Sequence, residues 1–411
     1  MFDELLTIAA GLALVVAVLS SQVQRGPVSG PLLALLVGVC VGPEVLGIVD
    51  VPTVMTEHSP LHEATRVLLA VSVMAVALRY PFRVARSRIR PVVVLLVVAM
   101  LGMALVTTAL SAAVLGVGLG AAALLGAALC PTDPVLASSV VTGEPAERQI
   151  TGRTRQLLSL ESGANDGLAL PLVLAAVAIA GTTHGGAALA ESLWQVLGAV
   201  VFGVVAGALA GAALRTAEKH RTIQSGPLLV YTLLLALFVL GAAGLMRMDG
   251  VLAVFVAGLA FNATSTVSER AAENDNDEAV NRFIVLPLFT VFGAMLPWRE
   301  WSEIGYGKLA LLAVGVLLLR RLPIVLALKK PLSLAWRDAL FLGWFGPIGV
   351  SALFYLTMEA HRLGTHHSVL AVGCLVVAVS TVVHGMTTTP ALTLYRKSEE
   401  RESGGRPREA G

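Results

Sequence analysis

The sequence predicts an all-α protein that crosses a membrane many times. Of its 411 residues, 56% are hydrophobic and only 14% are charged, and the mean hydropathy is +0.81. Ordinary soluble domains carry about 25% charged residues. The apolar residues also form runs close to the length of about 20 residues that a helix needs to cross the hydrocarbon. This composition excludes a soluble enzyme, and the net charge of +2 gives no reason to expect a nucleic-acid partner.

About thirteen segments meet the length requirement for a membrane span. The chain begins with the acidic stretch "MFDELL" instead of a basic signal-peptide region, so we expect the first span to be retained. Residues 395–411 are polar and are expected to form a short cytoplasmic tail without ordered structure. The predicted spans 1 to 13 lie at 5–21, 31–48, 65–80, 92–115, 121–142, 156–180, 192–214, 226–246, 249–263, 281–298, 307–328, 338–358 and 367–391.

The distribution of positive charge predicts the orientation. With the C-terminus in the cytoplasm, the loops on that side hold most of the lysines and arginines, as the positive-inside rule requires. The densest group lies between spans 3 and 4, where five arginines occur within residues 79–90. The acidic loop at 268–281 falls on the same side, although acidic residues weigh little in the rule. We therefore expect a plasma- or inner-membrane protein with its N-terminus outside.

Two predicted spans carry residues that interrupt a helix. Proline removes a backbone donor and clashes with the carbonyl one turn back, so both helices should open near their middle. Spans 5 and 12 are an odd number of crossings apart and run in opposite directions. Such a pair is typical of transporters built from two inverted repeats. The interrupting residues are Pro131 and Pro134 in span 5 and Gly346, Pro347 and Gly349 in span 12.

Five ionisable residues fall inside predicted spans, where each charge costs a few kcal/mol and a functional role is the default expectation. They are Asp133, Glu161, Asp166, Arg320 and Arg321. Glu161 needs a partner for its charge. Arg320, in the middle of span 11, is the first choice, and Arg321 is the alternative that the sequence leaves open. We expect this pair to be structural.

The remaining carboxylates predict an ion site. Ser162 and Asp166 are one helical turn apart and share a face that offers only oxygen atoms. Asp133 and Thr132, in the interrupted span 5, can add further oxygens, the ligand type that hard cations prefer. A proton suits the same carboxylate. Because one acid cannot hold both an alkali-metal ion and a proton, such a site combined with alternating access is an exchange mechanism.

Two stretches, "CPTDPVLASSVVTG" and "LLSLESGANDGLALP", resemble the monovalent cation/proton antiporter family, in the branch of bacterial NhaP-type and fungal plasma-membrane Na⁺/H⁺ antiporters. "LLLRRLPIVLAL", "GWFGPIGVSALFYL" and "VVHGMTTTP" extend the resemblance over most of the chain. It implies that Asp166 is the main ion- and proton-binding carboxylate and that Na⁺ binds at Asp166, Ser162 and Thr132. Asn165 stands where electrogenic relatives have a second aspartate, which implies electroneutral exchange of one cation for one proton. Of the two arginines, Arg320 is the better match for the partner of Glu161.

The resemblance also implies the architecture. Residues 1–394 would form one transmembrane domain, divided into a moving core (spans 4–6 and 11–13, about 92–180 and 307–391) and a dimerisation scaffold (spans 1–3 and 7–10, about 5–80 and 192–298). It implies a homodimer in the lipid bilayer with no cofactor beyond the transported Na⁺ and H⁺. One departure is Ile348, which stands where many bacterial relatives have an arginine.

Two other functions use the same residues. An intramembrane aspartic hydrolase would use Asp133 and Asp166 as its two acids. The sequence lacks the Gly-x-Gly-Asp signature of that class, however, and the two interrupted helices have no role in hydrolysis. An uncoupled cation channel would conduct without moving protons. The leading hypothesis is a secondary antiporter that exchanges Na⁺ for H⁺, with Li⁺ and K⁺ as further candidate cations.

Two further polar residues in or near the spans are expected to have no transport role. His384 should be packed or hydrogen-bonded inside span 13, and Asp249 should be solvated in the short turn before span 9.

Overall fold

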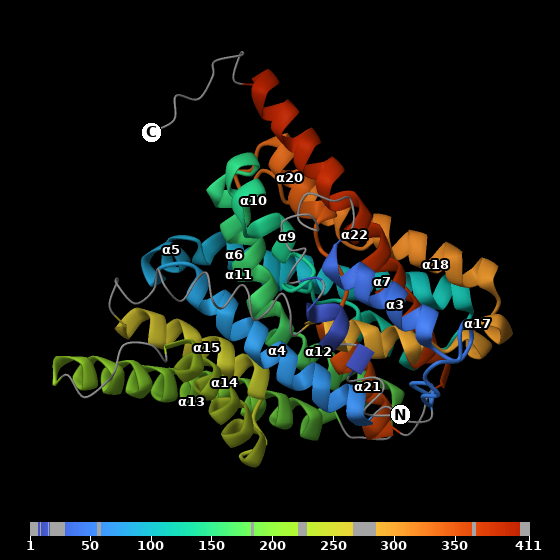
Figure 1. Ribbon diagram of the computed structural model, residues 1–411, viewed down its shortest axis with the longest axis horizontal. Helices are drawn as coiled ribbons and strands as arrows, with labels where there is room; N and C mark the ends of the chain where they lie inside the picture. Colours follow the sequence, from blue (N-terminus) through green and yellow to red (C-terminus); the bar gives the residue numbers. More distant parts are fainter. Residues whose placement is uncertain are drawn as a thin grey trace.

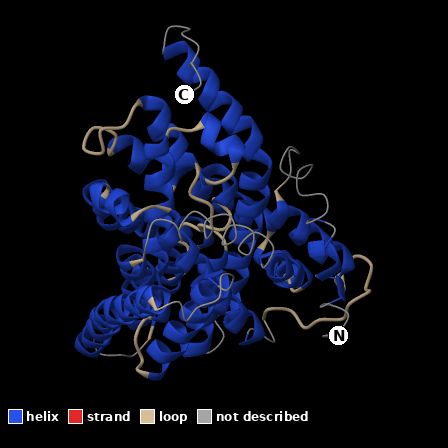
Figure 2. Cartoon of the chain, turned by 60° about the vertical axis from the view of Figure 1, so that its left-hand side comes forward, coloured by secondary structure: helices blue, strands red, loops and turns tan. Residues whose placement is uncertain are grey.

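The chain folds into a bundle of helices (Figure 1), and the connections between them are loops and turns (Figure 2). Within the described ranges every regular element is a helix. Six of these helices are long and apolar enough to cross a membrane, and shorter apolar helices accompany them. The predicted all-helical membrane fold is therefore confirmed. The computed structural model describes residues 7–8, 10–14, 16, 29–55, 59–181, 185–220, 228–265, 285–363 and 367–402.

One group of helices packs around α15. Its members are α4 (Ser59–Arg79), α13 (Gly185–Lys219), α14 (Leu228–Leu245) and α15 (Gly250–Thr264). Helices α13 and α15 approach so closely that a Cβ atom at Gly207 would lie 2.1 Å from the carbonyl oxygen of Ala257. The Asn262 amide on α15 donates to the carbonyls of Ala77 and Tyr80, at 2.9 and 2.8 Å. These contacts hold α4 and α13 firmly to α15.

The remaining helices and the connections between them hold the five ionisable residues of the predicted spans, and the long α22 runs among these helices (Figure 1). Residues 89–115 form one continuous rod with a π-helical turn in it. The helices in chain order are α3 (Gly30–Val41), α5 (Phe82–Ser87), α6 (Ile89–Val94), η1 (Leu95–Ala99), α7 (Met100–Leu115), α8 (Leu119–Ala128), α9 (Ser138–Val141), α10 (Glu144–Gln149), α11 (Gly152–Leu168), α12 (Leu170–Ala180), α17 (Trp298–Ile304), α18 (Tyr306–Leu319), α19 (Leu322–Ala327), α20 (Trp336–Trp344), α21 (Val350–Leu363) and α22 (His367–Glu402).

Helices stop at the two places where the sequence predicts interruptions. Helix α8 ends at Ala128, before Pro131, and helix resumes only at α9. Helix α20 ends at Trp344, before Pro347, and α21 begins at Val350. A third interruption was not predicted: α18 ends at Leu319 and α19 begins at Leu322, so Arg320 and Arg321 lie between two helices.

The tail differs from the prediction at its start. Helix α22 continues to Glu402, eight residues beyond 394. The hydroxyl of Tyr395 donates to Asp338, and Arg337 forms an ion pair with Glu399 at 3.9 Å, so α20 supports this helical extension. Residues 403–411, the acidic loop at 268–281 and most of predicted span 1 lie outside the described residues.

Candidate ion-binding site

The two interrupted helices meet at Asp133. Its backbone N–H donates to the carbonyl of Pro347 at 2.9 Å. Its Oδ1 accepts from the N–H groups of Val135 and Leu136, at 2.7 and 3.1 Å, and its Oδ2 accepts from the N–H of Val350 at the start of α21. Free N–H groups at a helix start carry partial positive charge and favour an anion. Asp133, fully buried, therefore neutralises the N-terminal ends of both continuing segments.

Glycine makes this close meeting of chains possible. A Cβ atom at Gly349 would lie 2.2 Å from Oδ2 of Asp133. A Cβ atom at Gly346 would lie 2.2 Å from Cδ of Arg321 and 3.0 Å from Cγ2 of Thr132. These glycines thus serve the packing of the two interruptions against each other, while Pro347 ends the helix.

Arg320 plays the opposite electrostatic role. One nitrogen of its guanidinium, Nη1, donates to the carbonyls of Leu129, Cys130 and Pro131, where α8 ends, and Nη2 donates to the carbonyl of Gly346 at 2.5 Å, beyond the end of α20. Unpaired carbonyls at a helix C-terminus favour a cation. The buried Arg320 and Asp133 therefore cap the negative and the positive ends of the interrupted helices.

The expectation that Arg320 pairs with Glu161 is wrong, because Arg321 is the partner. Its Nη1 and Nη2 each lie 2.6 Å from one carboxylate oxygen of Glu161, and its Nε donates to the carbonyl of Leu342 at 2.9 Å. The two arginines lie at the junction of α18 and α19, and each guanidinium binds different partners there. Residue spacing along a regular helix could not distinguish them.

A polar bridge joins the site helix α11 to the interruption in span 5. The Asn165 side chain accepts from the N–H of Thr132 at 3.3 Å and donates to its hydroxyl at 2.8 Å. The Thr132 hydroxyl also lies 2.9 Å from that of Ser162. All three side chains are fully buried. Asn165, Thr132 and Ser162, which the sequence predicted together, are thus brought together and hydrogen-bonded to one another.

Asp166 lies beside this bridge with its charge unmatched. The residue is fully buried, and neither carboxylate oxygen has a hydrogen-bond partner among the described residues. A buried carboxylate without partners is costly. The other predicted acids differ from it, because Glu161 is neutralised by Arg321 and Asp133 is occupied by backbone N–H groups. Asp166 is therefore the carboxylate of this cluster that is open to a cation or a proton.

Helix α21 contributes residues that the sequence analysis missed. Ser351 is fully buried and its hydroxyl has no hydrogen-bond partner among the described residues, and the Tyr355 hydroxyl donates to the backbone carbonyl of Asp166. Glu359 is 2% exposed, and neither of its carboxylate oxygens has a partner among the described residues. The spacing i, i+4, i+8 places these three residues along one side of α21. This spacing is visible in the sequence and could have identified the three residues as a polar stripe on one helix.

His384 and Ile348 both contribute to the packing and hydrogen bonding around the interruption before α21. The ring nitrogens of His384 lie 2.9 Å from the carbonyl of Ser380 and 3.0 Å from that of Trp344, which agrees with a hydrogen-bonded histidine. Ile348 is buried, and its N–H donates to the hydroxyl of Ser380 at 2.8 Å. The position where bacterial relatives carry an arginine is thus part of the apolar packing here.

These features define a multi-pass helical membrane protein with an oxygen-lined internal site suited to a small cation or a proton. The chain belongs to the sodium/hydrogen exchanger family: residues 10–394 match the profile described as "Sodium/hydrogen exchanger, transmembrane".

Fungal proteins are similar to this chain in sequence. "Na(+)/H(+) antiporter 2" of Zygosaccharomyces rouxii is 31% identical over 348 residues, which cover 82% of this chain and 43% of that protein. The "Na(+)/H(+) antiporter" of Saccharomyces cerevisiae is 28% identical over 305 residues, which cover 71% of this chain and 31% of that protein. The chain thus spans less than half the length of these two relatives.

A solved structure has the same fold. The sodium proton antiporter MjNhaP1 from Methanocaldococcus jannaschii superposes with a TM-score of 0.74 at 17% identity, covering 96% of this chain and 98% of that one. At this level of identity, the likeness concerns the fold.

Proposed function

We propose that this protein is a secondary active antiporter that exchanges Na⁺ for H⁺ by alternating access. The observation that carries the proposal is Asp166, a buried carboxylate with two unpartnered oxygens beside Thr132 and Ser162. Deprotonated, it binds a cation with help from the neighbouring hydroxyls; protonated, it is neutral and releases the cation. The two ligands exclude each other at one acid, so the site returns across the membrane only when it carries one of them.

Electroneutral exchange follows if Asp166 is the one group of the site that changes charge. Asn165 is neutral, and its amide is used in bonds to Thr132. Glu161 and Arg321 cancel each other, and Asp133 is held by backbone N–H groups. One proton leaving Asp166 then makes room for one monovalent cation. Such a cycle needs no cofactor.

The proposed motion involves the two groups of helices. The helices around α15 form the scaffold, and those joined through Asp133, Arg320 and the Arg321–Glu161 pair form the moving core. The hydrogen bonds of these residues tie segments far apart in the sequence into one body that moves without breaking the site. We further propose a homodimer assembled through the scaffold, in the plasma or inner membrane, with the C-terminus in the cytoplasm. The positive-inside pattern supports this orientation.

The alternative functions are less well supported. An aspartic hydrolase needs two acids that share one catalytic water. Both oxygens of Asp133 already accept backbone N–H bonds, so it is poorly placed to act on a substrate. An uncoupled channel predicts cation flux that generates no pH change.

The test uses proteoliposomes with an acidic interior and a pH-sensitive dye. Na⁺, Li⁺ and K⁺ are added outside in turn, with the wild type, Asp166→Asn and Glu147→Gln, which neutralises an exposed carboxylate away from the site. We expect Na⁺-driven dye recovery in the wild type and in Glu147→Gln, and none in Asp166→Asn. Recovery in Asp166→Asn would remove Asp166 from the mechanism. Radioactive Na⁺ uptake without dye recovery would establish a channel.

A further inference from the structure

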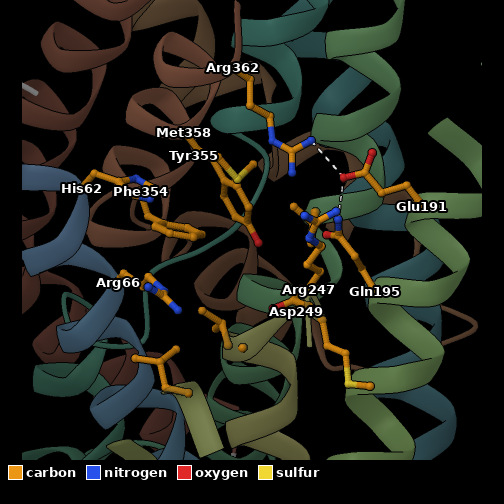
Figure 3. Close-up of a pocket in the computed structure, with 15 residues that line it drawn as sticks. His62, Arg66, Glu191, Gln195, Arg247, Asp249, Phe354, Tyr355, Met358 and Arg362 are labelled. Carbon is orange, nitrogen blue, oxygen red and sulfur yellow. Dashed lines mark hydrogen bonds and ion pairs between the residues drawn. The ribbon is translucent and has the colours of Figure 1, made fainter. Parts of the chain in front are cut away.

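A cavity opens at the end of the molecule opposite the C-terminal end of α22. Its volume is about 300 Å³. It lies where α4 and α15 begin and α21 ends, between the helices around α15 and those of the ion site. Figure 3 shows the Tyr355 hydroxyl pointing towards the middle of this cavity, with Glu191, Gln195 and Arg362 along one side.

Two residues that line the cavity are neighbours of Asp166. Tyr355 and Leu170 line it. The Tyr355 hydroxyl donates to the backbone carbonyl of Asp166, and Leu170 follows Asp166 by one helical turn. Tyr355 therefore links the lining of the cavity to the backbone of Asp166.

Asp249 lines the same cavity and is not the solvated turn residue that the sequence suggested. It is only 6% exposed. Its Oδ1 caps α15 by accepting from the N–H of Leu252 at 3.0 Å, and its own N–H donates to the carbonyl of Gln195 at 3.2 Å. Its Oδ2 has no hydrogen-bond partner among the described residues. Helix capping accounts for the hydrogen bond to Oδ1 of Asp249, but it gives no role to Oδ2.

The arginines around the cavity limit how strongly it can hold a cation. Arg362 is paired with Glu191 at 3.1 Å, and Arg66 with Glu63 at 3.3 Å. Arg247 lines the cavity two residues before Asp249, so its charge opposes any cation bound there. Weak binding is what a pathway requires, because an ion that binds too tightly does not move on.

We propose that Asp249 is a second, weaker binding site for the transported monovalent cation, on the access route from this side of the membrane to Asp166. The inference rests on the proposed antiport function. The cation binds the free oxygen of Asp249 with part of its water shell, and it passes to Asp166 when the Tyr355 side chain moves aside. Arg247 sets the strength of this site by repulsion.

The test measures the apparent KM for Na⁺ separately from each side of the membrane, in proteoliposomes whose orientation is known from protease removal of a C-terminal tag. Asp249→Asn keeps the helix cap, since asparagine caps as well as aspartate, but removes the charge. We expect it to raise the KM by about fivefold for Na⁺ supplied opposite the C-terminus. The KM from the C-terminal side and the maximal rate should not change. Arg247→Gln should have the opposite effect: it should lower the KM for Na⁺ supplied opposite the C-terminus.

The matched control is Glu303→Gln, which removes an exposed carboxylate outside the cavity. It should leave both KM values unchanged. Unchanged KM values in Asp249→Asn, or equal changes on both sides, would overturn the proposal for Asp249. If the wild type shows no exchange at all, the antiport function itself fails. Exchange that depends on Asp166 but not on Asp249 contradicts only the second site.

Discussion

The guanidinium of Arg321 and the carboxylate of Glu161 form a two-pronged ion pair, with both nitrogen–oxygen distances at 2.6 Å. The side chains are 2% and 0% exposed, so water does not share in their neutralisation. Removing one member of a buried pair leaves an uncompensated charge, whereas replacing both with apolar residues is often tolerated. The pair therefore holds α11 against the junction of α18 and α19, and the Glu161 carboxylate is already neutralised.

We predict that Arg321→Met lowers the free energy of unfolding by about 3–5 kcal/mol. The double variant Arg321→Met with Glu161→Leu should recover most of this loss, because no charge is left buried alone. Unfolding in detergent, followed by fluorescence, measures both. Arg299→Met, which breaks the exposed pair with Glu303, is the control and should have no measurable effect. A double variant as unstable as Arg321→Met would contradict the pairing.

The meeting of the two interruptions depends on Gly349. A Cβ atom there would lie 2.2 Å from Oδ2 of Asp133 and displace the acid from its N–H donors. We expect Gly349→Ala to lower the free energy of unfolding by about 2–4 kcal/mol and to abolish exchange. Gly118→Ala is the matched control, since nothing lies within 4 Å of a Cβ atom at that position. Equal behaviour of the two variants would show that the contact is unimportant.

The proposed competition between Na⁺ and a proton at Asp166 predicts a pH dependence. Only the deprotonated carboxylate binds a cation, so the apparent KM for Na⁺ should rise as the pH falls. In the range where Asp166 is mostly protonated, each pH unit should change the KM by about tenfold. Exchange rates in proteoliposomes, measured with equal pH on both sides at several Na⁺ concentrations, determine the KM. A KM that is constant while the maximal rate changes would argue for separate cation and proton sites.

Glu359 offers a prediction about stability. Its buried carboxylate has no partner among the described residues, and a buried polar group without a partner destabilises a fold. We expect Glu359→Leu to raise the free energy of unfolding by about 1–3 kcal/mol and to retain exchange. Melting in detergent and the dye assay test the two parts. A variant that melts lower would contradict the stability prediction, and a variant that loses exchange would show that Glu359 is needed in the cycle.

Much of the candidate site could be predicted because it follows from local rules. Proline removes a backbone donor and clashes with the carbonyl one turn back, so Pro131 and Pro347 marked the two breaks. The one-turn spacing of Ser162 and Asp166 placed them on one face of α11. Asp249 could not be judged in this way, because its burial depends on residues of α4, α13 and α21 that are distant in the sequence.

The sequence by itself determined that this protein is a multi-pass helical membrane protein with acids inside its spans, since apolar length and helix-breaking residues act locally. Only the tertiary structure decided which charges neutralise each other. Arg320 and Arg321 are neighbours of identical chemistry, yet one caps helix ends and the other binds Glu161. The difference arises from the chain direction between α18 and α19 and from the partners that packing brings near, and neither is encoded in the spacing of residues along one helix.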